Sequence, residues 1–564
     1  MHSKAAKIAL ISTLVFASCK GSPSKPNVTA GRPGGVIGDP NTGDPDPTNP
    51  NSQNAEGIPG LKALETVTAF PRLSHLQWSN AVRDLLLLTS PSTLAKGFPP
   101  DPEGSDFGNN SELLKVTAGL WTSYQNAAET LGDQIGKDQV AYKKLMPAGK
   151  TDAKSIVEAF LRRAYRRKAT AAEVTEMVGI YNNGAALTGI KDVTGAGMSA
   201  MVATVLQSPN FIYRVELGDK QNGSMALLNA YELASRLSFA AWNSIPDDEL
   251  LNLAESGELL KPATLKVQVA RLMKDARATE VLSFVHNKAF KIDTFVLNDA
   301  NLKTFPELTG IDNNTLYNEA DLFLKDVVIT SNKGLHEILT APYAFVNAKT
   351  APIYGVATSD TEMKKVDLNP AQRAGILSQI GFLASRSKQT EGRTAIIPRG
   401  HYVTESLLCA KMLGVPDPGK ESEKTFKTER ERIADRTSPA GCAGCHAKTL
   451  NPPGFGLENF GPSGKYRTAE SNGSPINAVD AYDFGDESVK FDGPVELAKG
   501  ISERLETHQC YIKRLIEALY GRSLDVSDAP LIAAAAKSSL EGSSAKELFL
   551  KILSDSQITV RANK

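Results

Sequence analysis

The sequence predicts a mainly α-helical, multi-domain protein that includes, toward its C-terminus, a loop-rich region around two cysteines. Apolar residues recur at helical spacing over most of the chain, as in Trp78, Val82 and Leu85. The 564 residues are 41% hydrophobic, enough for roughly two to four domains with cores of their own. One segment departs from the helical pattern, because it is rich in Pro and Gly and contains Cys442-Ala443-Gly444-Cys445-His446.

Helical periodicity divides the chain into four regions. We expect an N-terminal helical domain over residues 59–215, a central helical domain over 216–365, a domain around the cysteine motif over 366–470 and a C-terminal helical domain over 471–564. The predicted helices cover residues 73–88, 111–135, 153–167, 171–181, 197–206, 227–241, 260–290, 314–330, 335–339, 369–385, 400–413, 495–519, 529–540 and 545–553, with one more starting at Pro246.

The N-terminus carries the pattern of a bacterial lipoprotein signal. Lys4 and Lys7 precede an apolar run over residues 8–16, and Ala17-Ser18 leads directly to Cys19. We therefore expect export after cleavage of residues 1–19, with lipid on Cys19, at a membrane facing the periplasm or the cell surface. The alternative is an ordinary signal peptide with a spare thiol. The apolar run is too short to span a bilayer, so we expect membrane contact through the lipid alone.

Residues 20–58 consist largely of Pro, Gly, Asn, Ser, Thr and Asp. A segment of this composition buries too little apolar surface to offset the entropy of ordering it. We expect a disordered tether, which would reach roughly 35 Å as a coil.

The charge balance argues against nucleic acid as a partner. Lys plus Arg and Asp plus Glu number 63 each, so the formal net charge is zero. Neither a basic nor an acidic excess is present to attract an oppositely charged polymer.

The string C-x-x-C-H is the pattern that covalent attachment of haem requires. Two thiols at this spacing add to the haem vinyl groups, and the next imidazole binds the iron from the proximal side. We expect Cys442 and Cys445 as thioether anchors and His446 as iron ligand of one haem c. The alternatives are a structural metal site or disulfide and a redox dithiol. Zinc needs two further ligands at short spacing, and a redox dithiol is typical of a βαβ unit rather than a Pro- and Gly-rich loop.

The two remaining cysteines of the exported chain are Cys409 and Cys510. An oxidising compartment favours their pairing, and the alternative is two buried thiols. A disulfide closing a loop of about 100 residues would stabilise the fold by up to roughly 4 to 5 kcal/mol in the chain-entropy model.

Other polar clusters have structural interpretations. Asp247, Asp248 and Glu249 follow Pro246, which is typical of the first turn of a helix rather than of an acid–base pair. His286 and His336 lie on predicted helices, where packing or solvation is the expected role. The spacing of four acidic residues does not fit an EF-hand loop, so we expect a solvated acidic loop at Asp480, Asp483, Asp486 and Glu487.

Many stretches together resemble the secreted cytochrome-c-like proteins of planctomycetes and myxobacteria, which are built from successive domains of unknown function. The resemblance covers about residues 70–525 and rests on Arg72-Leu73-Ser74-His75-Leu76-Gln77-Trp78, Arg163-Ala164-Tyr165-Arg166-Arg167, Leu206-Gln207-Ser208-Pro209-Asn210-Phe211, Arg236-Leu237-Ser238-Phe239, Arg373-Ala374-Gly375-Ile376-Leu377, Pro398-Arg399-Gly400, the haem motif with Pro453-Gly454-Phe455, and Tyr520-Gly521-Arg522. It implies a c-type cytochrome, makes residues 366–470 the cytochrome-c-like haem-binding domain, and supplies no established reaction. Lys168 stands where these proteins often have Pro, and Arg436 where they often have His.

The sixth iron ligand is not the common downstream methionine. Met412 is the last methionine of the chain and precedes the motif. The remaining candidates are an open or weakly held site, ranked first, then His508, and then Met412 and His401.

Three functions are compatible with these features. The first is an extracytoplasmic, lipid-anchored c-type cytochrome that transfers electrons to or from a redox partner. The second is a haem oxidoreductase or peroxidase-like enzyme acting on a small-molecule substrate, and the third is a surface binding scaffold with a structural haem. An open iron site would favour the second, and a sixth Met or His the first.

Overall fold

The computed structural model describes residues 61, 70–102, 107–109, 113–222, 225–297, 305–388, 393–410, 424–485 and 487–562. The expected signal segment with Cys19, the expected tether over residues 20–58, and Met412 lie outside these residues. Helices dominate the described part, which confirms the predicted mainly α, multi-domain class. Among the described residues, none of the helices combines the length and apolarity that crossing a bilayer requires.

The N-terminal helices pack around α8, which is apolar on all sides and buried over most of its length. The elements of this region are α2 (His75–Leu86), η2 (Thr93–Gly97), α3 (Ala118–Lys137), α4 (Gln139–Leu145), α5 (Ala153–Ala164), α6 (Ala171–Asn182), α7 (Gly184–Thr188), α8 (Val193–Leu206) and α9 (Pro209–Ile212). Their apolar side chains form a core of their own, to which the following region adds little more than Phe239 and Ile245.

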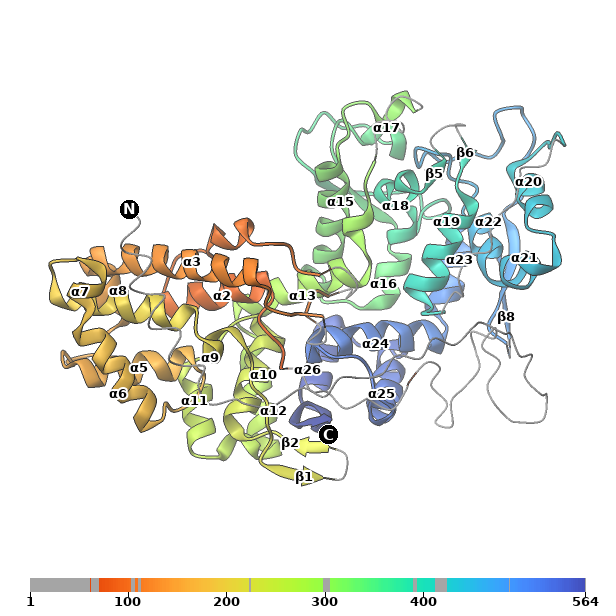
Figure 1. The fold of residues 1–564 in the computed structure, drawn as a ribbon. Coiled ribbons are helices and arrows are strands. Elements are labelled where there is room, and N and C mark those ends of the chain that lie inside the picture. Colours follow the sequence, from red (N-terminus) through yellow and green to blue (C-terminus); the bar gives the residue numbers. More distant parts are fainter. Residues whose placement is uncertain are drawn as a thin grey trace, which may run out of the picture.

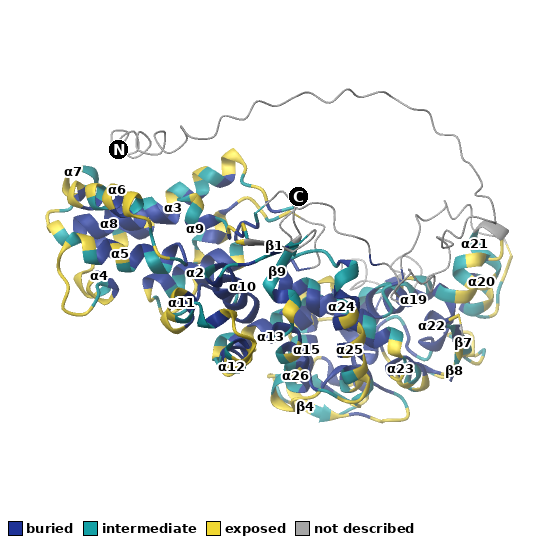
Figure 2. Ribbon diagram, turned by 90° about the horizontal axis from the view of Figure 1, so that it is seen from below, coloured by how far each residue is buried: buried dark blue, intermediate teal, exposed yellow. Residues whose placement is uncertain are grey.

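The central region alternates helices with short strands. Its elements are β1 (Lys220–Asn222), β2 (Met225–Leu227), α10 (Ala230–Trp242), α11 (Asp248–Glu255), η3 (Glu258–Leu260), α12 (Pro262–Leu272), α13 (Ala276–Ala289), η4 (Ile292–Thr294), η5 (Pro306–Leu308), α15 (Asn313–Lys325), the π-turn η6 (Asp326–Thr330), α16 (Leu335–Thr340), β3 (Tyr343–Val346), α17 (Ala351–Tyr354) and β4 (Lys364–Asp367). Figure 2 shows that α10, at the centre of this region, is almost wholly buried.

Short helices and two hairpins form the region around the cysteine motif. They are η7 (Ile376–Ser378), α18 (Ile380–Ser385), β5 (Ser387–Lys388), β6 (Arg393–Thr394), α19 (Ile396–His401), the π-turn η8 (Tyr402–Leu407), α20 (Glu429–Arg436), α21 (Ala440–Cys445), the π-turn η9 (His446–Leu450), α22 (Asn451–Gly456), β7 (Val479–Asp483) and β8 (Ser488–Asp492). The strands of each hairpin are antiparallel, β5 with β6 and β7 with β8.

The C-terminal segment returns to the middle of the molecule. It comprises α23 (Pro494–Ser502), α24 (Leu505–Tyr520), η10 (Val526–Asp528), α25 (Ala529–Leu540), α26 (Ala545–Leu553), η11 (Ser556–Thr559) and β9 (Val560–Ala562). In Figure 1 the blue α24 to α26 lie between the N-terminal helices at one end and α20 to α22 at the other. The last strand, β9, pairs antiparallel with β2, which is more than 300 residues earlier in the chain.

One large apolar core joins the regions after residue 227. Buried side chains from all of them contribute to it, among them Leu237, Phe323, Tyr402, Phe460 and Ile516. The predicted boundaries at 215, 365 and 470 stay predictions, but the central and C-terminal helices share a core and do not pack as separate bodies.

Several predicted helices differ from the observed ones. The helix predicted over 111–135 begins only at Ala118, where Thr117 caps it, and the helix predicted over 369–385 is replaced by the short η7 and α18. The sequence did not predict α20 to α22. The Pro- and Gly-rich stretch after the motif was expected to be a loop, yet it forms α22, which continues η9 and packs closely against α19 at Gly454.

Candidate haem-binding site

The C-x-x-C-H motif lies on a continuous helical segment. Cys442 and Cys445 belong to α21, and His446 begins the π-turn η9 that leads into α22. Residues three apart on a helix face the same side, so both thiols are presented together. Both cysteines are free thiols of intermediate exposure, and the Thr449 hydroxyl donates to the backbone oxygen of Cys445.

A directional chain of hydrogen bonds orients His446. The Thr437 hydroxyl donates to the Ile433 carbonyl oxygen at 2.8 Å, so its single proton is used and its oxygen accepts from Asn451 Nδ2 at 2.8 Å. The side-chain oxygen of Asn451 therefore faces His446, whose Nδ1 lies 3.2 Å away. Because an amide oxygen only accepts, Nδ1 carries the proton, and the lone pair of the neutral ring is on Nε2.

The two side chains that orient His446 are more deeply buried than His446 itself. Thr437 and Asn451 are 6% and 3% exposed, while His446 is only half-buried. The orienting groups are thus held inside the protein, and the ring they hold is open to a ligand. Metal-binding histidines are ordinarily oriented in this way, by a hydrogen bond from the nitrogen that does not bind the metal.

Helix α19 and the following π-turn η8 contact the backbone of the segment η9–α22, which contains His446. A Cβ atom on Gly400 would lie 1.8 Å from the Leu450 backbone oxygen, and one on Gly454 would lie 2.3 Å from the Ile396 oxygen. The Thr404 hydroxyl donates to the Thr449 backbone oxygen at 2.8 Å. Only glycines at these two crossing points allow α19 to approach η9 and α22 so closely.

Arg399 holds the chain that follows α22. Its buried guanidinium donates to the backbone oxygens of Phe460 and Gly461 at 2.7 and 2.9 Å and to Leu383 at 3.1 Å. Burial lowers the pKa of Arg399 to about 10, so the group stays charged at neutral pH. The stretch Pro398-Arg399-Gly400 therefore has a structural role, which is to fix the segment around the motif.

The residues present fit a covalently attached haem. Two unlinked, partly exposed thiols share one helix face, and the adjacent imidazole has its free nitrogen available. The zinc alternative needs four converging ligands, and within the described ranges no group of three or more His, Cys, Asp and Glu side chains converges on a common point. The disulfide alternative is not realised, since the two sulfurs are not bonded to each other.

The structure places two of the candidate sixth ligands in different settings. His508 on α24 is 1% exposed, with Nδ1 at 2.7 Å from Ser539 Oγ and Nε2 at 2.9 Å from the Ser502 backbone oxygen, so both ring nitrogens are engaged. Burial lowers the pKa of His508, which keeps the ring neutral. His401 ends α19 with a 45% exposed side chain, 3.4 Å from Glu405. His508 therefore has no free ring nitrogen for iron, whereas the side chain of His401 is accessible.

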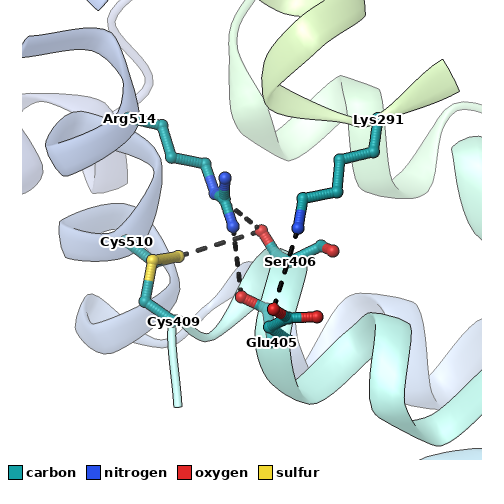
Figure 3. Close-up of a disulfide and its surroundings, with 6 residues drawn as sticks. All are labelled: Lys291, Glu405, Ser406, Cys409, Cys510 and Arg514. Carbon is teal, nitrogen blue, oxygen red and sulfur yellow. Dashed lines mark hydrogen bonds and ion pairs between the residues drawn. A yellow bond between two sulfur atoms is a disulfide. The ribbon is translucent and has the colours of Figure 1, made fainter. Parts of the chain in front are cut away.

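Cys409 and Cys510 form the predicted disulfide. Their Cα atoms lie 5.4 Å apart, and the bond links positions separated by 101 residues. Figure 3 shows Arg514, one turn beyond Cys510, reaching across to the η8 backbone, where it donates to Ser406 at 3.1 Å and to Glu405 at 3.2 Å. The disulfide and this arginine together attach α24 to the segment that supports the haem motif.

The surface beside the motif is mainly basic. A hollow of about 590 Å³ lies against α20, and Arg436 lines it. Its other charged lining residues are Arg393, Lys424, Lys427, Glu429, Arg432, Arg467 and Glu470. Arg436 therefore contributes to an anion-attracting surface next to Thr437.

Asp247 and the two histidines on helices have the structural roles that were expected of them. Asp247 caps α11 by accepting from the Leu250 N–H at 3.0 Å. His286 is fully buried, and His336 is exposed at 3.3 Å from Ser502 Oγ. The expected solvated acidic loop is wrong, because Asp480 and Asp483 lie on strand β7 of the β7–β8 hairpin, and Asp480 pairs with Arg430 and Glu487 with Arg504. Asp486 lies outside the described residues.

The sequence analysis missed Thr437 and Asn451 as part of the site. No local signal identifies them, because Asn451 reaches His446 across the five residues of a π-turn and Thr437 belongs to a separate helix end.

Four family models match the chain one after another, and each describes a protein of unknown function. They are PSD3 (DUF1587) over residues 72–136, PSD5 (DUF1595) over 152–216, PSD4 (DUF1592) over 228–356 and PSCyt3 (DUF1588) over 373–470. The PSCyt3 match contains the C-x-x-C-H motif, and its name points to a cytochrome-like family. No curated protein and no solved structure matches the chain.

Proposed function

Because four PSD and PSCyt domains follow one another along this chain, with the motif inside the PSCyt3 match, we propose that the protein is an extracytoplasmic c-type cytochrome with one covalent haem. The observation that carries the proposal is the geometry of the motif. Two free thiols lie on one helix face, and His446 is held through Nδ1 with Nε2 free.

Each residue of the site has a role in this function. Cys442 and Cys445 anchor the haem through thioether bonds, and His446 binds the iron through Nε2. When bound, haem c supplies a one-electron couple at its iron. Asn451 and Thr437 hold the imidazole in one tautomer and one orientation, which sets how strongly it donates to the metal.

Two features of the sequence support export and a lipid anchor, and one feature of the structure supports export. The lipoprotein-type signal ending at Cys19 and the Pro- and Gly-rich segment after it belong to a protein tethered outside the cytoplasm. The Cys409–Cys510 disulfide is typical of an oxidising compartment. The protein thus faces the periplasm or the cell surface, where haem is attached to C-x-x-C-H motifs.

Electron transfer is the primary role in this proposal. The hydrogen bonds of His508 favour a second candidate function, that of a peroxidase-like enzyme. Since both ring nitrogens of His508 are hydrogen-bonded, this histidine does not serve as the sixth ligand in the present arrangement. An iron with an open sixth position would admit peroxide or another small ligand, which is the basis of the peroxidase-like alternative.

The test is to produce the protein together with haem-attachment machinery and to denature it in acidic organic solvent. Haem that stays on the polypeptide in a peroxidase stain supports covalent attachment, and colour that leaves the chain refutes it. Replacing Cys442 and Cys445 by Ala must abolish the stain, whereas the matched Cys409→Ser/Cys510→Ser variant must retain it. Spectra of the oxidised and reduced protein then separate a six-coordinate, low-spin electron carrier from a high-spin, open site.

A further inference from the structure

The hollow of about 590 Å³ against α20 is built from three separate segments of the chain. Strand β6 supplies Arg393 and Thr394, and the chain that follows α22 supplies Arg467 and Glu470. The third segment is α20 with the residues that lead into it. In Figure 1 β6 and α20 lie at the same end of the molecule. A hollow of this volume accommodates a small-molecule ligand.

The described lining of this hollow is positively charged. It contains six cationic side chains and two carboxylates. The cations are Arg393, Lys424, Lys427, Arg432, Arg436 and Arg467. Lys424 also pairs with Asp435 outside the lining at 2.6 Å, which still leaves a positive excess. A concave surface lined by charges of one sign focuses their field and attracts ions of the opposite sign.

The two carboxylates hold two of the arginines in place. Glu429 accepts from Arg432 Nε at 2.9 Å, and Glu470 accepts from a terminal nitrogen of Arg467 at 2.8 Å. The other oxygen of Glu470 accepts from the Glu429 backbone N–H at 3.1 Å, which joins the two pairs. The side chains of Arg432 and Arg467 are only 11% and 22% exposed. Guanidinium groups ordered in this way lose little further entropy when an anion binds.

Arg467 keeps hydrogen-bond donors for a ligand. Of its five N–H groups, one donates to the Glu458 backbone oxygen, one to the Glu470 carboxylate and one to the Glu458 carboxylate. Among the described residues no acceptor is present for the other two. Lys427 is exposed at the hollow and forms no ion pair with a described residue. Both cations are therefore available to the oxygens of a carboxylate or phosphate group.

Thr394 gives an independent indication of a ligand at the same place. It lines the hollow and is only 2% exposed, yet its hydroxyl has no hydrogen-bond partner in the described part of the chain. A buried hydroxyl without a partner is costly, so a bound molecule ordinarily satisfies it. The neighbouring Glu458 has one carboxyl oxygen, Oε1, in the same condition. Burial raises the pKa of Glu458 to about 7, so in mildly acidic solution this carboxyl adds little negative charge beside the hollow.

We propose that this hollow binds a small organic molecule that carries two or more carboxylate or phosphate groups. The cations come from three segments around the hollow, so a molecule with several oxyanion groups reaches them where a single group does not. The Thr394 hydroxyl donates to one of these groups. None of the described lining residues belongs to the C-x-x-C-H motif, so the site does not depend on the haem function proposed above.

The test is titration calorimetry of the full-length protein, produced with the haem-attachment machinery, at pH 6 and low ionic strength. The probes are tricarballylate, which carries three carboxylates, and pyrophosphate. The control ligand is the triamide of tricarballylic acid, which has the same skeleton without charge. We expect one anion per chain and at least tenfold weaker binding of the triamide. The tighter of the two probes assigns the natural oxyanion group as carboxylate or phosphate.

Two substitutions locate the bound anion. Thr394→Val removes the unpartnered hydroxyl and keeps the shape of the side chain, so it should weaken binding about fivefold without lowering Tm. Lys427→Gln should also weaken binding about fivefold, which corresponds to the loss of a partly exposed ion pair. Lys490→Gln is the matched control, because Lys490 is an exposed lysine on β8 outside the hollow, and it should leave binding unchanged.

Several results would overturn the proposal. They are the absence of binding of both anions, binding of the triamide as tight as that of tricarballylate, and a loss in Lys490→Gln as large as in Lys427→Gln. Full affinity for both anions in Thr394→Val and in Lys427→Gln would also overturn it, since the anion would then bind elsewhere. The comparison of the three ligands on the unmodified protein needs no variant to fold.

Discussion

Asn451 connects the haem motif to the interior of the protein. Its side-chain oxygen holds His446 Nδ1, and its nitrogen is held in turn by Thr437. A ligand imidazole whose second nitrogen donates a hydrogen bond is a stronger electron donor to its metal. The strength of that bond therefore sets the haem potential in the proposed cytochrome.

Changing Asn451 should shift the midpoint potential in opposite directions for two substitutions. Asn451→Leu removes the acceptor and should raise the potential by about 60 mV, since weaker donation disfavours the ferric state by roughly tenfold. Asn451→Asp places a carboxylate beside the Nδ1–H group of His446 and should lower the midpoint potential. Spectroelectrochemical titration measures both. Asn472→Ala, on an exposed turn of the same region, is the control and should leave the potential unchanged. Shifts of the same sign in both Asn451 variants would contradict this account.

His286 is a buried neutral histidine with a defined pH dependence. Its Nδ1 lies 2.7 Å from the Leu282 oxygen and its Nε2 lies 2.6 Å from the Tyr511 hydroxyl, and burial lowers its pKa to about 4. In the unfolded chain the pKa of His286 is near 6.5. Between pH 6.5 and pH 4 the unfolded state therefore binds a proton at this residue and the folded state does not. The contribution to stability is full above pH 6.5 and falls as the pH drops toward 4, by roughly 3 kcal/mol.

Replacing the pair by His286→Leu/Tyr511→Phe should remove this pH dependence. Both polar partners disappear together, so neither leaves an unsatisfied group. Denaturant titrations at pH 7.5 and pH 5 should show the variant losing less free energy of unfolding on acidification than the unmodified protein. The comparison is needed because burial also raises the pKa of Glu319 and Glu458 to about 7, which makes stability fall as pH rises from 4.5 through 7. An identical pH profile in the variant would refute the role of His286.

At the scale of elements, the contact between α19 and the segment η9–α22 decides how the motif is held. Two short helices interrupted by π-turns have little stability of their own. They are stabilised here by close backbone contact and by the Arg399 hydrogen bonds. The position of His446 therefore depends on a helix that precedes it by almost fifty residues.

Gly400→Ala should destabilise the protein by about 3 kcal/mol, since the new Cβ would meet the Leu450 backbone, which cannot give way without moving η9. Thermal unfolding of the haem-loaded protein measures the loss, and the yield of haem-loaded protein should fall with it. Gly444→Ala is the matched control inside the motif itself, because nothing lies within 4 Å of a Cβ added there. If both substitutions were equally tolerated, the α19 contact would not be what holds the motif.

At the scale of the whole molecule, the chain closes on itself twice. The Cys409–Cys510 disulfide links the region before the haem motif to α24. Strand β9 then pairs with β2, and Arg236 donates to the backbone oxygens of Ile558 and Val560 at 2.9 and 2.6 Å. These closures hold the haem region to a core shared with the central helices.

Cys409→Ser/Cys510→Ser should lower the free energy of unfolding by up to about 4 kcal/mol, because the disulfide restricts a loop of 101 residues in the unfolded chain. Denaturant unfolding in the absence of reductant measures the loss. Non-reducing peptide mapping of the unmodified protein should show one cross-linked pair. Alkylation of both cysteines without prior reduction would contradict the disulfide.

The sequence by itself determined the helical class, most of the longer helices, the haem motif and the cysteine pair. The helices and the C-x-x-C-H motif follow from local spacing, such as apolar residues every three or four positions and two thiols three apart. The Cys409–Cys510 pair follows from the count of remaining cysteines and an oxidising compartment. The capping role of Asp247 is also local, because it depends only on the residues that begin α11.

Only the tertiary structure decided how the site is built. The helical state of Asn451–Gly456 depends on contact with α19, and the hydrogen bonds of Asn451 depend on the meeting of a π-turn with the end of α20. His508 and His401 look alike in the sequence, yet the first is closed off by Ser502 and Ser539 and the second is half exposed. Which polar groups are satisfied is a property of non-local packing, and no local pattern records it.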